Sequence, residues 1–118
     1  IMKTQKNGVI ILTSSGAGVD GSSSSFAYGS SKGGVHGLSM VLMDKLSKYG
    51  IRVHDILPGS VDTPLKNSQI ENTRDITGNE AEYKNIKNIL VEPKGIAEII
   101  LFMCSDNAYL LKGSIRTQ

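Results

Sequence analysis

The sequence has little of what marks a secreted, membrane-embedded or metal-binding protein. Its 118 residues include a single cysteine, Cys104. No internal disulfide can therefore form, which favours a reducing compartment, and we expect a cytoplasmic location. No apolar run approaches the roughly 18 residues that a bilayer-spanning helix needs, so we expect no membrane segment. Histidine, cysteine and carboxylate side chains do not have the spacing of metal ligands, so no metal is expected.

An excess of charge of one sign is also missing. The chain has 13 lysines and arginines against 11 acidic residues, a formal net charge of +2 at pH 7. Nucleic-acid-binding proteins usually concentrate basic residues on one face or in runs, and no strong basic cluster exists here. We therefore expect no nucleic-acid partner. The hydrophobic share of 39% is typical of a folded globular chain with one small domain.

What the sequence does contain is a series of short apolar segments. Val9 to Leu12 is a continuous, mostly β-branched run, which predicts a strand buried on both faces, as in a parallel sheet. Residues 51–57 form a second strand candidate that ends at Pro58-Gly59. A third strand is expected after Gly113.

Helical periodicity appears between these strands. Residues 27–49 and 93–104 carry apolar side chains at steps of three or four, and residues 1–6 resemble the end of a helix. A long polar segment covers residues 60–88, with a short helix expected near 80–90. The order strand, helix, strand, helix, strand predicts an α/β fold with a parallel sheet and right-handed crossovers.

The first strand is followed by a serine- and glycine-rich stretch, 13–25, which we expect to be a polar loop. Within it, G16-A-G18-V-D-G21 matches the dinucleotide pattern G-x-G-x-x-G. A phosphate cradle also needs a helix that begins inside the motif, and no apolar helical period begins there. This interpretation is therefore disfavoured, although a phosphate-binding module remains an alternative.

Hydrolytic chemistry is disfavoured as well. His54 and Asp55 are neighbours on a predicted strand, so their side chains point to opposite faces and cannot form a dyad. His36 lies on a predicted helix, where we expect a surface or packing role. No G-x-S-x-G motif is present.

Tyr28 and Lys32 form the most informative pair. At positions i and i+4 on a helix, their Cβ atoms are expected to lie about 6 Å apart. The phenol of a tyrosine has an ordinary pKa near 10, and a lysine ammonium about 4 Å away stabilises the phenolate by roughly 4 kcal/mol at an effective dielectric near 20. Such a pair can act as a general acid and base. The turn is lined with small residues that leave room for a bulky neighbour: Gly29, Ser30, Ser31, Gly33 and Gly34.

The same Y-x-x-x-K spacing recurs at Tyr83 and Lys87. This second pair lies in a polar segment, and the residue thirteen positions before its tyrosine is Ile70, which has no hydroxyl. The residue thirteen positions before Tyr28 is Ser15. We therefore predict that the second pair is an ordinary solvated helix face.

Three stretches in this order resemble the short-chain dehydrogenase/reductase family. They are V9-I-I-L-T-S-S15-G-A-G18, then Y28-G-S-S-K32, then I51-R-V-H-D-I-L-P58-G59-S-V61-D-T63-P. The resemblance covers most of the chain apart from residues 68–88. It implies an oxidoreductase that uses NAD or NADP and interconverts a carbonyl and an alcohol in a small-molecule substrate.

The resemblance also implies a role for each site residue. Tyr28 would donate a proton in carbonyl reduction or remove one in alcohol oxidation. Lys32 would favour the phenolate and hold the nicotinamide ribose hydroxyls, and Ser15 would hydrogen-bond the substrate oxygen. The remaining implied contacts are with the cofactor, through the backbone of Pro58, Gly59 and Val61 and the hydroxyl of Thr63.

The chain lacks two segments of the family pattern. The glycine-rich nucleotide loop G-x-x-x-G-x-G has no match, and neither has the family's N-N-A-G-type segment. We therefore expect residues 1–118 to be a partial NAD(P)-binding Rossmann-like domain, the C-terminal half of a parallel sheet without the N-terminal nucleotide-binding half. Alone, this chain should be marginally stable and inactive, with an unpaired edge on the strand 9–12.

A second function remains open. The chain could be a truncated, non-catalytic relative that binds a partner through the helix 27–49, where Gly33 and Gly37 would permit close helix contacts. In the family this helix commonly packs against a second subunit. The resemblance therefore also implies a homo-oligomer formed through the same helix.

Overall fold

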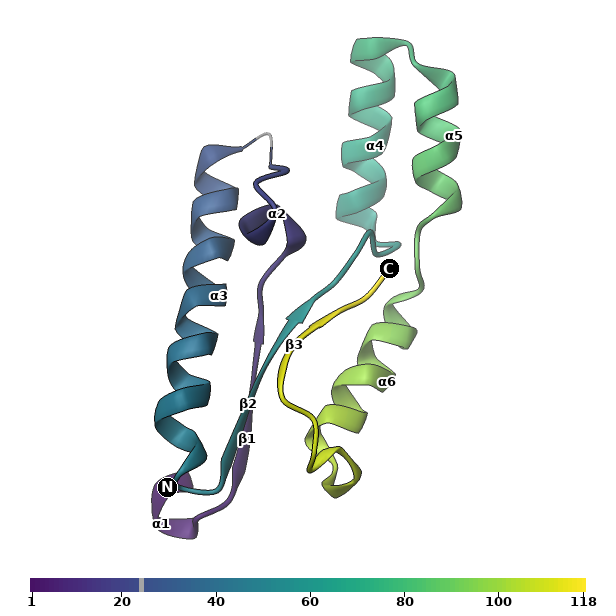
Figure 1. Cartoon of the computed structure of the whole chain (residues 1–118). Helices are drawn as coiled ribbons and strands as arrows, with labels where there is room; N and C mark the ends of the chain where they lie inside the picture. The colour runs from purple at the N-terminus through teal and green to yellow at the C-terminus, as the bar shows by residue number, and fades with distance from the viewer. Residues whose placement is uncertain (24) are drawn as a thin grey trace.

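The computed structural model describes residues 1–23 and 25–118; Ser24, in the predicted loop 13–25, lies outside the described residues. Three parallel strands form one sheet: β1 (Gly8–Thr13), β2 (Ile51–Leu57) and β3 (Gly113–Arg116), in the order β1-β2-β3 (Figure 1). The predicted α/β fold with a parallel sheet is confirmed, and each predicted strand lies within two residues of its expected bounds.

The middle strand, β2, forms the centre of the core. Six of its seven residues are buried, whereas Val9 to Leu12 of β1 are only half-buried. The prediction that β1 is buried on both faces is therefore wrong. The physical reason is its place at the edge of the described sheet, where it pairs with β2 alone.

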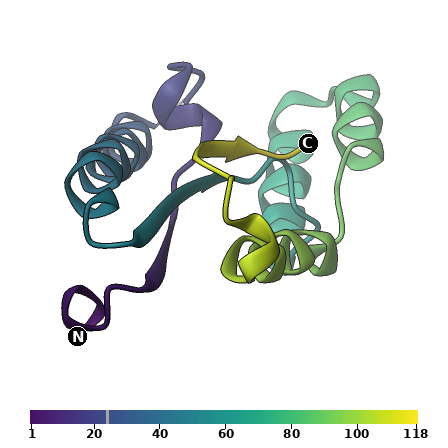
Figure 2. The same ribbon diagram turned by 60° about the horizontal axis from the view of Figure 1, so that its bottom comes forward.

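Helices lie on both sides of this sheet. The longest, α3 (Phe26–Ser47), begins at Ser25, whose side chain accepts a hydrogen bond from the Tyr28 N–H, and it packs against β1 and β2. On the other side lies α6 (Pro93–Cys104), so the two helices flank the strands (Figure 2). Both agree with the predicted helices 27–49 and 93–104.

Arg52 of β2 joins the sheet to the end of α6. A guanidinium is well suited to this position, because the last carbonyls of a helix lack partners and carry partial negative charge. Its two terminal nitrogens donate at 2.9–3.4 Å to carbonyl oxygens that end α6 or belong to the 3-10 helix η1 (Asp106–Ala108): those of Met103, Cys104, Ser105 and Ala108.

Two further helices, α4 (Pro64–Thr77) and α5 (Glu80–Asn88), form a hairpin beyond the carboxyl ends of the strands (Figure 1). The helix predicted near 80–90 is confirmed as α5, whereas no helix was predicted where α4 lies. The helix α4 begins where the Thr63 hydroxyl accepts a hydrogen bond from the Lys66 N–H, and it ends at Gly78 with a φ of 65°.

The described residues are more extended than a compact domain of this length. Their radius of gyration is 16.8 Å, whereas about 13.5 Å is typical for 118 residues.

The short first helix α1 (Met2–Gln5), at one end, matches the helix tail expected over residues 1–6. Among the helices described, none has the length and apolar character needed to cross a membrane.

Candidate active site

One open cavity of about 1100 Å³ lies at the carboxyl ends of β1 and β2, the edge where α/β sheets bind ligands. Its walls come from the turn after β1, the first two turns of α3, the segment after β2 and the α4–α5 hairpin. Every residue for which the sequence predicted a catalytic or cofactor contact lines it: Ser15, Tyr28, Lys32, Pro58, Gly59, Val61 and Thr63.

The turn after β1 contains a short helix, α2 (Gly16–Val19), so the prediction of a continuous polar loop over 13–25 is wrong. Ser15 caps this helix by accepting a hydrogen bond from the Ala17 N–H at 3.3 Å. A Cβ atom at Gly18 would collide with the backbone of Lys32 and Gly33. The glycine therefore lets α2 pack directly on α3, which keeps the turn that carries Ser15 beside Lys32.

The small residues of α3 receive parts of this same turn. Gly33 faces the backbone of Gly18, and a Cβ atom at Gly29 would lie 3.1 Å from the Ser23 Cβ. The sequence predicted that a bulky group lies against these small residues. In the structure, α2 and Ser23 of the same chain fill part of this space. A Cβ atom at Gly34 would meet nothing within 4 Å among the described residues.

Tyr28 and Lys32 lie side by side, but the lysine is directed to the backbone. The Lys32 Nζ donates to the Thr13 carbonyl at 3.0 Å and lies 5.9 Å from the centroid of the Tyr28 ring. Tyr28 is half-exposed toward the cavity. The lysine therefore links the end of β1 to α3 within one helical turn of the phenol.

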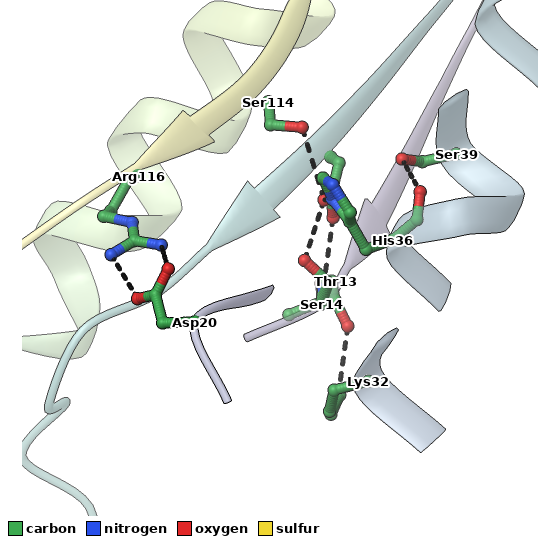
Figure 3. Close-up of polar contacts among 9 residues, drawn as sticks. Thr13, Ser14, Asp20, Lys32, His36, Ser39, Ser114 and Arg116 are labelled. Carbon is green, nitrogen blue, oxygen red and sulfur yellow. Dashed lines mark hydrogen bonds and ion pairs between the residues drawn. The ribbon is translucent and has the colours of Figure 1, made fainter. Parts of the chain in front are cut away.

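The turn after β1 is also held to the far side of the sheet (Figure 3). Arg116 at the end of β3 donates to both carboxylate oxygens of Asp20 at 2.7 and 3.0 Å. The hydrogen bond from Arg116 lowers the pKa of the Asp20 carboxyl from its ordinary value. A bidentate pair of this kind fixes orientation as well as distance.

The segment after β2 approaches the chain's last residues. The Gly59 N–H donates to the Thr117 Oγ1 at 3.2 Å, and a Cβ atom on Gly59 would collide with the backbone of Gln118. The resemblance implied that the backbone of Gly59 contacts the cofactor. In the structure, part of this backbone contacts residues 117–118.

Val61 and Thr63 keep groups available on the cavity wall. Val61 forms an isolated parallel bridge with Val91, through hydrogen bonds from Val91 N–H to Ser60 O at 2.9 Å and from Asp62 N–H to Val91 O at 2.8 Å. The bridge therefore does not use the N–H and C=O of Val61 itself. The Thr63 hydroxyl accepts the helix cap bond of α4 and retains its own proton as a donor.

Sequence reasoning missed a cluster of polar side chains beneath the cavity. His36 was expected to have a surface or packing role, but its Nδ1 lies 2.7 Å from the Asp55 carboxylate, which is wholly buried. Ser14, also buried, donates to the same carboxylate. The available signal was the four-residue spacing of Tyr28, Lys32 and His36, which places all three on one face of a helix.

His54 points to the opposite face from Asp55, as predicted. It is fully buried, and neither ring nitrogen has a hydrogen-bond partner among the described residues. Burial lowers the pKa of its imidazole, and the charge of Arg52 lowers it further.

The second tyrosine–lysine pair lies between helices and is only partly solvated, which corrects the prediction of an ordinary solvated face. The Tyr83 hydroxyl donates to a carboxylate oxygen of Glu71 at 2.8 Å, and Lys87 donates to the Asn67 side chain at 2.6 Å. The hydrogen bond to Glu71 raises the pKa of the Tyr83 phenol. This tyrosine is therefore held in its protonated form.

Comparison with known proteins finds the same family that the sequence motifs resemble. A family model described as short chain dehydrogenase matches residues 1–74. Tropinone reductase-like 1 of Erythroxylum coca is 35% identical over 113 residues, which are 96% of this chain and 42% of that protein. Two solved structures are similar over 98% of this chain: actinorhodin polyketide ketoreductase with NADPH (27% identity, TM-score 0.85, 48% of its length) and NAD+-bound xylitol dehydrogenase (25%, 0.81, 49%).

This chain thus spans less than half the length of these relatives. The family model covers more than half of the chain itself, and the parallel sheet agrees with the solved relatives. The chain belongs to the short chain dehydrogenase family.

Proposed function

We propose that this chain carries the catalytic part of an NAD(P)-dependent oxidoreductase that interconverts a carbonyl and an alcohol in a small molecule. The observation that supports this most is the single cavity that Ser15, Tyr28 and Lys32 share with the segment Pro58 to Thr63. The relatives' names point the same way, because they include reductases and dehydrogenases of small molecules.

The three polar side chains have separate tasks in this proposal. Tyr28 gives its phenolic proton to the substrate oxygen in reduction and removes a proton from the alcohol in oxidation. Ser15 donates a hydrogen bond to the same oxygen as negative charge develops on it. Lys32 brings a positive charge beside the phenol and, through the Thr13 carbonyl, holds the end of β1 next to α3.

The cavity wall suits a nicotinamide cofactor. Lys32 offers an ammonium for ribose hydroxyls, Val61 offers backbone groups that its bridge to Val91 does not use, and Thr63 offers a hydroxyl proton. The bound nicotinamide would supply or accept the hydride. Both NAD and NADP are compatible with these residues. Of the two solved relatives, the ketoreductase holds NADPH and the xylitol dehydrogenase holds NAD+.

A matched pair of substitutions tests the proposal in the full-length protein. Tyr28→Phe should lower kcat at least about 100-fold, because general acid–base catalysis contributes roughly 10²–10⁴-fold. Tyr83→Phe removes the same hydroxyl from the other Y-x-x-x-K turn and should change kcat less than about threefold. Equal effects of the two substitutions, with both proteins folded, would contradict the proposal.

A partner-binding module is the second candidate, and one observation is compatible with it. On α3, the apolar side chains of Leu38, Met40 and Val41 are at least 50% exposed. We propose that the side of α3 that carries Leu38 and Val41 contacts a second copy of the chain, a contact that serves the enzyme and the module equally. Unchanged biological function in Tyr28→Phe would favour the module. The homo-oligomer and the cytoplasmic location stay predictions.

A further inference from the structure

The carboxylate of Asp55 is the centre of a hydrogen-bond network with Ser14, His36 and Ser114. Figure 3 labels these three partners together with Lys32. Asp55 is wholly buried, and burying an ionised carboxylate is costly unless donors surround it. Ser14 supplies two donors, its N–H to Oδ1 at 3.2 Å and its hydroxyl to Oδ2 at 2.8 Å. His36 Nδ1 lies 2.7 Å from Oδ2, and the Ser114 hydroxyl lies 3.5 Å from it.

The network draws on all three strands and on α3. Asp55 lies on β2 opposite Leu12 of β1 and Ser114 of β3, and His36 reaches it from α3. The Asp55 carboxylate therefore joins the sheet to α3 by hydrogen bonds. A carboxylate with this many donors fixes their relative positions more tightly than apolar contacts do, because each hydrogen bond has a preferred direction.

The network adjoins Ser15 directly. Ser14, which Asp55 binds through both its N–H and its hydroxyl, is the preceding residue, and its N–H also lies 3.0 Å from the Ile56 carbonyl. One residue earlier, Lys32 binds the Thr13 carbonyl. Two consecutive turns of α3 thus hold the end of β1 and the residue that follows it. Thr13 is held through Lys32, and Ser14 is held through His36 and Asp55.

We propose that His36 and Asp55 are positioning residues, which set the peptide of Ser14 so that the Ser15 hydroxyl is placed for the substrate oxygen beside Tyr28. This inference rests on the proposed function. Its physical basis is that a displacement of about 1 Å in a catalytic group can cost about 100-fold in rate. The pair acts through Ser14 and does not itself touch the substrate.

Two substitutions of His36, made in the full-length protein, test the role of its N–H. His36→Leu removes the donor to Asp55, and we expect kcat to fall about tenfold with KM changed less than about threefold. His36→Asn can keep a neutral N–H close to the place of Nδ1, and it should retain kcat within about threefold. Equal kcat values for the two variants would overturn the inference.

A double substitution separates positioning from stability. In His36→Leu/Asp55→Val the buried ion is gone and an apolar pair takes its place, so thermal stability should recover relative to His36→Leu. The kcat should stay about tenfold low, because Ser14 has lost both contacts to the carboxylate. Recovery of kcat together with stability would show that the pair serves stability alone, and the inference would fail.

Hydrogen exchange gives a readout that does not depend on turnover. In His36→Leu, the amides of residues 13–19 should exchange about tenfold faster, whereas those of α5, residues 80–88, serve as an internal reference and should not change. Unchanged exchange over 13–19 overturns the inference whatever the kinetics. If Tyr28→Phe keeps full turnover, the proposed function fails separately, and faster exchange over 13–19 still upholds the positioning of Ser14 by Asp55.

Discussion

Tyr28 with Lys32 and Tyr83 with Lys87 have the same spacing on a helix, yet their side chains meet different groups. Tyr83 donates its hydroxyl proton to Glu71 on the neighbouring helix. The Tyr28 hydroxyl makes no hydrogen bond within the described residues, and its lysine reaches the end of β1 at 3.0 Å. Both tyrosines border the same cavity.

The difference teaches that the spacing alone does not decide the chemistry. A carboxylate acceptor holds the proton of Tyr83 on the phenol and raises its pKa, which opposes the role of a base. Tyr28 instead has a hydroxyl residue nearby on the cavity wall, Ser15, and a lysine whose position the strand fixes. The neighbouring elements, α4 in one case and the end of β1 in the other, make the distinction.

Removing the charge from each lysine should give the largest difference in kcat between the two tyrosine–lysine pairs. Lys32→Met keeps the length of the side chain but loses the ammonium, so we expect kcat to fall about 100-fold. Lys87→Met should change kcat less than about threefold, because its ammonium serves the contact between α4 and α5. Steady-state kinetics on both variants, with circular dichroism to establish folding, measure this. A loss of similar size in Lys87→Met would contradict the assignment.

A pair of glycine substitutions tests how the Tyr28 turn is built. Gly18→Ala forces α2 away from Lys32 and Gly33, and it should lower the free energy of unfolding by about 1–3 kcal/mol and reduce kcat. Gly34→Ala is the control, since its Cβ would meet no described residue within 4 Å, and it should stabilise α3 by about 0.5–1 kcal/mol. Denaturant unfolding measures both. Equal stabilities would show that α2 does not need the close contact.

The smallest expected effect concerns the Tyr83 turn in acid. The hydroxyl of Tyr83 is the main cause that lowers the pKa of Glu71 from its ordinary value of 4.5, and Lys87 and Arg74 add to it. A depressed carboxyl pKa stabilises the folded state above pH 4.5, and this contribution is lost as pH falls through the lower folded value. The protection of the backbone amides of residues 80–88 against hydrogen exchange should therefore fall between about pH 5 and pH 3, after correction for the pH dependence of the intrinsic exchange rates. Glu71→Gln should show no such fall, and an identical fall in that variant would contradict the explanation.

The sequence allowed most of the fold to be predicted, because apolar runs and helical periodicity mark β2, α3 and α6 directly. The helix α4 was missed because its residues are mostly polar, although two local signals were present. Thr63 followed by Pro64 is a typical helix start, and Gly78 is a typical helix end. The half-exposure of β1 could not be predicted from its apolar residues, because it depends on which strands lie beside it.

The candidate site was predictable only in part for a similar reason. The resemblance named the residues that line the cavity, and the i,i+4 spacing placed Tyr28 beside Lys32. The contact between His36 and Asp55 joins a helix to a strand 19 residues later. Its formation depends on the register of the sheet and the rotation of α3, and neither can be worked out from local patterns in one sequence.

Arg52, far from the cavity on the same central strand, has a consequence of another kind. By binding four carbonyl oxygens at the end of α6 and in η1, it ties both helices to the sheet without bordering the cavity. A substitution there would leave each correctly folded molecule as competent as before but would reduce the number of such molecules that a cell retains. The phenotype of such a variant would resemble that of a lower gene copy number, and higher expression of the variant protein would compensate for it.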